Sequence, residues 1–337
     1  MMRRTLATLG SPFLAARWPI VGLALLLVFN AAATPGFYAL ELRDGRLFGV
    51  LVDILNHGSR VAIVAIGMTL VIATGGVDLS VGAVAAISGA TAAIMVAHGH
   101  GSWYTAIAAA LAVSGLAGLW NGVLVASLRL QPIVATLILM VAGRGIAQLL
   151  TDGLIITFED PALAFLGNGA IGGLPIPVWT MIGVLGACTL ATRRTSVGLF
   201  IEAAGDNEAA ARLSGVSVRA VKVCVYTFCG VCAGIFGIIE CSYIKAADSN
   251  NAGQLLELDA ILAVVIGGTS LNGGRFRLLG TVIGALAMQT LTKTMYMLDV
   301  SAEIVPAPKA VAVLLICLLQ SERIGRYLGG LTERGRA

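Results

Sequence analysis

Few residues in this sequence have the types and spacing that catalysis or metal binding requires. Cys229 and Cys232 form a CxxC pair, but no second ligand pair accompanies it, and all six cysteines lie in apolar runs. The three histidines do not form a metal-ligand set. No GxxxxGK[ST] loop, GxSxG turn or HExxH helix occurs. We therefore expect no catalytic residue, no metal site and no cofactor in this chain, which excludes most enzyme classes.

The remaining candidates are polar residues in apolar surroundings, which are costly in a membrane unless they face a bundle interior or a water-filled path. Arg144 is the most costly, and either substrate contact or pairing with an acid or with helix-end carbonyls would explain it. Asp78 either contacts a ligand or caps the next helix, together with Ser80. Asp259 has the same two interpretations, and Asn121 suits an interhelical hydrogen bond. The candidate path residues are Asp78, Asn121, Gln131, Arg144, Asp259 and Asn272.

The longest polar island runs from Thr195 to Gly215 and contains a short helix signature. Asp206 or Asn207 can cap its start with a side-chain oxygen. Glu208 and Arg212 suit the positive and negative ends of the helix dipole, and Gly215 supplies a left-handed stop. A helix of roughly two turns is marginal alone. It is either an ordinary loop helix or a docking element for a soluble partner.

The elements that carry these residues are predicted to be membrane helices, because the chain is 58% hydrophobic and 12% charged with a mean hydropathy of +0.91. We predict an all-α polytopic protein with short broken helices in one domain, residues 18–320, and terminal segments 1–17 and 321–337. About ten spans fit the apolar runs: 18–34, 59–73, 79–97, 103–127, 131–150, 176–191, 221–243, 259–268, 276–295 and 306–319.

Positive charges fix the predicted orientation. With the N-terminus in the cytoplasm, fifteen basic residues lie inside and six outside, with Arg144 in the membrane; the six are Arg43, Arg46, Arg60, Lys245, Lys293 and Lys309. We therefore expect the chain to lie in the inner membrane, with both termini and the loop 193–220 in the cytoplasm. An uncleaved first span is preferred to a signal peptide.

A faint internal repeat pairs residues 70–90 with residues 263–285. Each segment has an apolar run, a Gly-Gly break, a polar turn and a helix of small residues. Paired breaks of this kind point to a transport path, because unwound backbone is tolerated where it lines a cavity. Two ordinary glycine-rich turns are the alternative. Only 6% of the residues are aromatic, so sugar contacts on such a path would be weak, and selectivity would reside in a separate binding protein.

Four motifs together resemble the transmembrane subunits of bacterial ribose, xylose and galactose ABC importers: IGMTLVIATGGVDLSVGA (66–83), LQPIVATLILMVAGRGIA (130–147), SVGLFIEAAGDNEAAARLSGV (196–216) and LELDAILAVVIGGTSLNGGRF (256–276). They occur in the family's order over about 200 residues. DGRLFGVLVDILN (44–56) and NNAGQLLELDAILAVVIGG (250–268) are similar to a galactofuranose importer permease.

The resemblance implies two paired permease chains, identical or homologous, a cytoplasmic ATPase that binds the ATP, and a periplasmic sugar-binding protein. It also implies that the island carries a coupling helix, Asp206 to Leu213, with Gly205 and Gly215 as hinges. The expected coupling residues are Glu202, Gly205, Asp206, Asn207, Glu208, Arg212, Leu213 and Gly215. The alternatives are an ion-coupled secondary sugar transporter, for which Glu240 is the candidate titratable acid, and a membrane scaffold without transport.

Overall fold

The computed structural model describes residues 17–43, 45–301, 303–311 and 314. The described residues are 71% helical and 5% strand, in agreement with the expected all-α class. Its helices are α2 (Arg17–Ala33), α3 (Val50–Ala73), α4 (Val81–Ala97), α5 (Trp103–Ala126), α6 (Pro132–Leu150), α7 (Pro161–Asn168), α8 (Ile176–Arg194), α9 (Val197–Asp206), α10 (Glu208–Leu213), α11 (Val218–Ile244), α12 (Leu256–Ile266) and α13 (Leu278–Met297).

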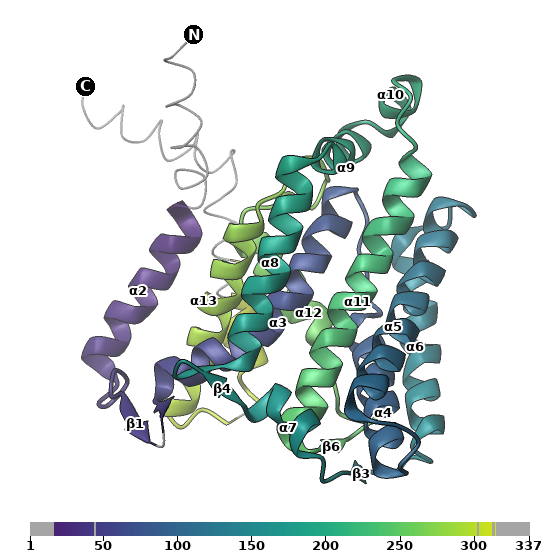
Figure 1. Cartoon of the computed structure of the whole chain (residues 1–337). Coiled ribbons are helices and arrows are strands. Elements are labelled where there is room, and N and C mark those ends of the chain that lie inside the picture. Colours follow the sequence, from purple (N-terminus) through teal and green to yellow (C-terminus); the bar gives the residue numbers. More distant parts are fainter. Residues whose placement is uncertain (1–16, 44, 302, 312–313, 315–337) are drawn as a thin grey trace, which may run out of the picture.

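The strands form three short antiparallel pairs in the connections. The first is a hairpin of β1 (Glu41–Arg43) and β2 (Arg46–Phe48). The second joins β3 (Ile156–Thr157) to the distant β6 (Ala246–Ala247), and the third joins β4 (Ala170–Ile171) to β5 (Leu174–Pro175). Figure 1 shows β1, β3 and β6 at one end of the bundle and α9 and α10 at the other. We call these the strand end and the α10 end.

Five helices of the described residues are long and apolar enough to cross a membrane, namely α3, α5, α6, α8 and α11, and α2 and α4 are shorter apolar helices. This pattern fits a polytopic membrane protein. The count of ten spans stays a prediction. Its tenth member lies mostly outside the described residues, as do the segments 1–16 and 315–337.

Several predicted boundaries were wrong, most of all for the second span. α3 begins at Val50 and not at Ser59, because Asp53 is tolerated in its first turn. Arg60, which the charge count placed on the outer side at the start of the predicted span, therefore lies well within the helix. The eighth span is α12, which is only 11 residues long and begins at Leu256. The loop 151–175 contains α7, capped by Asp160, whose carboxylate accepts the Leu163 N–H at 2.7 Å.

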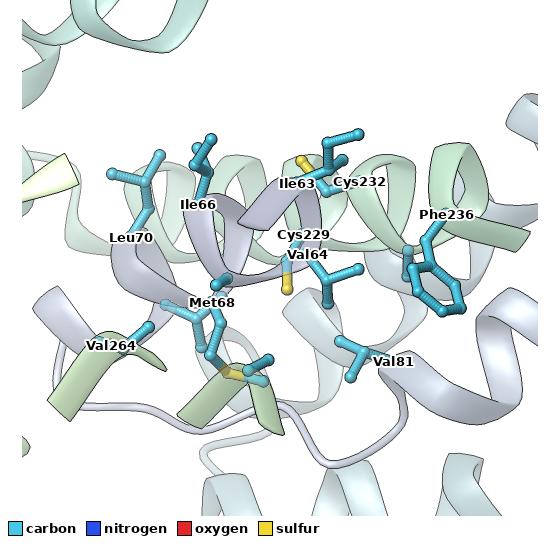
Figure 2. Packing of buried hydrophobic residues seen from close by; sticks show 14 of the residues in the cluster. Ile63, Val64, Ile66, Met68, Leu70, Val81, Cys229, Cys232, Phe236 and Val264 are labelled. Carbon is cyan, nitrogen blue, oxygen red and sulfur yellow. The ribbon is translucent and has the colours of Figure 1, made fainter. Parts of the chain in front are cut away.

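The core lies between α3 and α11, which are mostly buried, whereas only about a third of the residues of α5, α6 and α8 are buried. Figure 2 shows Ile63, Val64 and Ile66 of α3 near Cys229 and Cys232 of α11. Glycines allow these helices to approach closely: a Cβ on Gly67 of α3 would lie 2.9 Å from the Cys229 Cα. Close backbone approach replaces the hydrophobic effect as the driving force for packing inside a membrane.

Two connections interrupt the bundle without helical structure. Residues 74–80 separate α3 from α4, and residues 245–255 separate α11 from α12. The two segments meet where α4 and α12 begin, because a Cβ on Gly253 would lie 2.7 Å from the Gly82 carbonyl oxygen and one on Gly82 would lie 2.9 Å from Glu257 Oε2. The N-terminal ends of two short helices therefore meet inside the bundle.

Candidate functional site: the α10 end and the buried polar groups

The helix α10 begins with a side-chain cap at Asn207. The Asn207 Oδ1 accepts the Ala210 N–H at 3.0 Å, which satisfies one of the free donors of the first turn. The helix ends at Gly215, whose φ of +83° is the left-handed conformation that glycine adopts without strain. Of the two predicted caps, Asn207 is therefore correct and Asp206 is not.

Glu208 fastens α10 to the start of α11. One carboxylate oxygen lies 2.8 Å from the Lys222 Nζ, and the other pairs with Arg212 one turn further along α10. The hydrogen bond from Lys222 is the largest influence on the pKa of Glu208 and lowers it. Because these two cations hold Glu208, its carboxylate stabilises the local structure.

The opposite face of α10 is free. Leu213 is 91% exposed, and Arg212 is exposed beside it. Ala211 is buried against Ala204 of α9 and Val218 of α11. Within the alanine run, Ala211 therefore packs inside, while Ala209 and Ala210 face outward. An apolar side chain exposed at the tip of a short, well-anchored helix is typical of a protein contact.

The predicted coupling helix, Asp206 to Leu213, is wrong at its start. The island folds as two helices, because the chain breaks at Asn207, where φ is −153° and ψ is 100°. Asp206 is the last residue of α9, and Glu202 is half-buried within that helix. The sequence-based prediction missed α9, whose apolar residues looked like a continuation of the preceding loop.

Gly205 is not at the break but at a close contact inside α9. A Cβ on Gly205 would overlap the carbonyl oxygen of Ala73, the last residue of α3, and would lie 2.5 Å from the Gly274 nitrogen. The same Ala73 oxygen accepts the Gly274 N–H at 2.9 Å. A Cβ on Gly273 would lie 3.1 Å from the Gly75 nitrogen. Gly75 of the first predicted Gly-Gly break therefore lies near Gly273 and α9 at the α10 end, whereas the second break, Gly267–Gly268, packs against the start of α13.

Asp78, Ser80 and Asn121 form one buried polar cluster. The Asp78 Oδ1 accepts the Ser80 N–H at 2.9 Å and the Ser80 hydroxyl at 2.6 Å. The Asn121 amide of α5 donates to Ser80 Oγ at 2.8 Å and to Asp78 at 3.3 Å. Asn121 is fully buried and Asp78 is 1% exposed. The expected cap at Asp78 was wrong, because α4 begins after Ser80 and has no side-chain capping bond. Asp78 instead fixes the turn before the helix, and Asn121 links α5 to the segment that leads into α4.

Arg144 holds the interrupted segment between α11 and α12. Its Nη1 donates to the Ser249 carbonyl at 3.1 Å and to the Ala252 carbonyl at 2.6 Å. Arg144 therefore binds backbone carbonyls, but these lie in the connection between α11 and α12 and not at a helix end as expected. A guanidinium suits this task because it is always charged and presents several donors in a fixed geometry.

The other predicted path residues do not join this cluster. Gln131 is exposed and immediately precedes α6. Asn272 is exposed in the loop after α12. Asp259 does not cap its helix but lies in its first turn, where it pairs with Lys309 at 3.1 Å.

Arg60 and Glu240 form a buried ion pair that the sequence did not reveal. The Arg60 Nη1 lies 2.6 Å from the Glu240 Oε2, with side-chain exposures of 2% and 31%. The guanidinium also lies 4.1 Å from the centre of the Tyr243 ring and donates to the Asn56 carbonyl at 3.4 Å. A sequence signal for the position of Arg60 was present in residues 50–55. Their apolar pattern, interrupted only by Asp53, indicates that the helix begins before Ser59 and that Arg60 lies within it.

The CxxC pair has no metal partners in the part of the chain that the structure describes. Cys229 and Cys232 are buried and face Gly67 of α3. No group of three or more histidine, cysteine or acidic residues that could hold a metal ion is found among the described residues. Both cysteines contribute to helix packing.

Long apolar helices, two non-helical interruptions at the centre and buried polar residues that fix those interruptions define a polytopic membrane transport protein. The chain belongs to the family described as branched-chain amino acid transport system / permease component, whose profile matches residues 50–320.

The curated relatives carry sugar names. The galactofuranose transporter permease of Escherichia coli (strain K12) is 49% identical over 100% of both chains. The ribose import permease of the same organism is 40% identical over 90% of this chain and 93% of the relative. The L-arabinose ABC transporter permease of Azospirillum brasilense is 32% identical over 75% of this chain and 73% of the relative. No solved structure matches the chain.

Proposed function

We propose that this chain is the permease subunit of an ATP-binding-cassette importer that moves a monosaccharide across the inner membrane. The observation that carries the proposal is the 49% identity, over the full length of both chains, to a galactofuranose transporter permease. Galactofuranose is accordingly the proposed substrate. Other relatives are named for ribose, fructose and L-arabinose, so the sugar class rests on more than one protein.

The proposal assigns the energy source to a separate cytoplasmic ATPase. The sequence contains no phosphate-binding loop, and the exposed tip of α10 offers a contact for such a partner. The coupling surface comprises Arg212, Leu213 and the exposed alanines Ala209 and Ala210. The positive-inside count supports a cytoplasmic location for this end and for both termini. A second permease chain and a periplasmic sugar-binding protein complete the importer.

The α10 end offers a direct mechanical path from this partner to the centre of the bundle. α9 contacts the end of α3 and the loop after α12 through Gly205, Ala73 and Gly274. The end of α3 leads into the interruption 74–80 before α4, and the loop after α12 leads into α13. ATP binding that moves α10 and α9 would therefore shift the interruption before α4 and the end of α12, provided that the ATPase binds the two states with different affinity.

The coupling surface is tested by Leu213→Asp in the complex of both permease chains with the ATPase. We expect loss of ATPase co-purification and of binding-protein-stimulated ATP hydrolysis, because a buried unpaired carboxylate opposes docking. The matched control is Leu154→Asp, a residue that is 65% exposed and lies just before β3, away from α10, and that should retain the ATPase. Undiminished association in Leu213→Asp would contradict the proposed coupling surface.

The substrate is tested separately by uptake of labelled sugars in cells that lack this chain. We expect uptake of galactofuranose to be lost and uptake of ribose through other systems to be unchanged. Retention of galactofuranose uptake would exclude it as the substrate. The ion-coupled alternative receives no support from Glu240, because Arg60 already pairs with its carboxylate.

A further inference from the structure

A cavity of about 140 Å³ lies beside the Arg60–Glu240 pair, between α4, α11 and the segment after β6. A single water occupies roughly 10–15 Å³ on this measure, so the cavity has room for about ten water-sized groups, which is the scale of one monosaccharide. Small residues make the space: Ala86, Gly89 and Ala90 of α4 face Gly237 of α11. The polar wall consists of Glu240, Asp248, Ser249 and Asn251.

The charges of this wall are already compensated. The Glu240 Oε2 is held by the buried Arg60. Asp248 accepts the backbone N–H groups of Asn250 and Asn251 at 3.1 and 3.2 Å and the Asn251 amide at 2.7 Å, and the hydrogen bond from the Asn251 side chain is the main cause of its lowered pKa. Arg60 compensates the charge of Glu240, and both Asp248 oxygens already accept hydrogen bonds, so the wall offers a cation little uncompensated negative charge. The wall therefore suits a neutral polar ligand.

Acceptors for such a ligand remain on two side chains. Among the described residues, neither the Glu240 Oε1 nor the Asn251 Oδ1 accepts a hydrogen bond. Hydroxyl groups are donors that match both positions. Hydrogen bonds to a charged acceptor are stronger than neutral ones, so Glu240 would supply most of the polar attraction.

The wall is also held in place before a ligand arrives. Arg144 fixes the Ser249 and Ala252 carbonyls, and the Thr151 hydroxyl lies 3.1 Å from the Ser249 Oγ. β6, at the start of the segment 245–255, pairs with β3. A preformed wall lowers the entropic cost of binding.

We propose that this cavity is a binding site for a neutral monosaccharide in transit, with Glu240 and Asn251 accepting hydrogen bonds from its hydroxyl groups. The proposal rests on the proposed sugar-import function and adds the place within the bundle where the sugar is held. Arg60 is a positioning residue, since it fixes Glu240 and does not line the cavity.

The test uses the complete importer, with the ATPase, the second permease and the binding protein, in vesicles supplied with labelled galactose or ribose. Ala90→Leu fills the cavity, and Glu240→Asp withdraws the free oxygen while keeping a charge for Arg60. We expect uptake per ATP hydrolysed to fall at least about tenfold in Ala90→Leu, since pocket size alone discriminates by that order. Uptake of galactose, a hexose, should fall more than uptake of ribose, a pentose. Binding-protein-stimulated hydrolysis should persist in both variants.

The control is Ala108→Leu, the same change on the exposed side of α5. Equal uptake per ATP in wild type and in both cavity variants would overturn the proposal. A parallel loss of uptake and hydrolysis would overturn it too, because the defect would then lie in assembly. If Ala90→Leu does not assemble, Glu240→Asp decides. Failure of the wild-type complex to transport any sugar would instead reject the proposed function.

Discussion

Gly205 of α9 lies directly on the carbonyl oxygen of Ala73, the last residue of α3, and leaves no space for a side chain between them. The same oxygen accepts the Gly274 N–H, so three segments far apart in the sequence share one backbone contact. Movement of α9 is therefore transmitted to the end of α3 and to the loop after α12.

Gly205→Ala is expected to separate these segments. The added methyl group meets backbone atoms that cannot rotate away, and overpacking of this kind costs about 1–3 kcal/mol. We expect a lower melting temperature in detergent and a larger loss of sugar uptake. Gly186→Ala is the control, because a Cβ on Gly186 of α8 meets no atom within 4 Å. Equal melting temperatures and uptake for the two variants would refute the transmitting contact.

Glu208 is expected to make the stability depend on acid pH. Its pKa is lowered in the fold, so its contribution is complete above the unfolded pKa of about 4.5 and is lost as the pH falls through the folded value. Wild type should therefore lose more stability than Glu208→Gln below pH about 4.5. Melting temperatures of both proteins between pH 7 and 3 measure this. The side chain is 39% exposed, so solvent screening keeps the effect small. If the melting temperatures of the two proteins fall in parallel as the pH is lowered, Glu208 does not form these ion pairs in solution.

Asn121→Ala is expected to loosen the interruption between α3 and α4. It removes both hydrogen bonds to Asp78 and Ser80 inside a fully buried site, while Asp78 and Ser80 stay bonded to each other. Each lost hydrogen bond contributes about 0.5–1.5 kcal/mol. Melting temperature should fall, and uptake should fall with it. Gln131→Ala, on an exposed residue, should change stability by less than about 0.5 kcal/mol. A wild-type melting temperature in Asn121→Ala would show that the cluster does not stabilise the interruption.

Arg60 and Glu240 are expected to behave as one unit in a double-mutant cycle. Arg60→Met leaves the Glu240 carboxylate, which is 31% exposed, without its partner. Breaking a fully buried pair costs about 3–5 kcal/mol, and we expect a smaller loss here because this carboxylate is partly exposed. Removing the carboxylate as well, in Arg60→Met with Glu240→Met, should recover part of that loss. Melting temperatures of the two single variants and the double variant give the coupling. Strict additivity would mean that the residues act independently.

The sequence alone was sufficient for the helical membrane class and for the end of α10 at Gly215, but the start of α10 was predicted two residues too early, at Asp206. Long apolar runs require helices in a membrane, because unpaired backbone groups are costly there. The family resemblance, read from four motifs, agrees with the matched profile over residues 50–320. Asn207, Glu208 and Gly215 act through neighbours within a few residues, so local chemistry was enough to predict a capped helix that ends at glycine.

Only the tertiary structure decided which distant groups meet. Arg60 and Glu240 are 180 residues apart, and Arg144 reaches carbonyls more than 100 residues away. Backbone carbonyls are present at every residue, so no sequence pattern identifies the ones that Arg144 selects. Gly205 likewise reads as a hinge in the sequence, whereas packing against Ala73 makes it a contact. These choices depend on how the helices pack, which the spacing of residues along one helix does not determine.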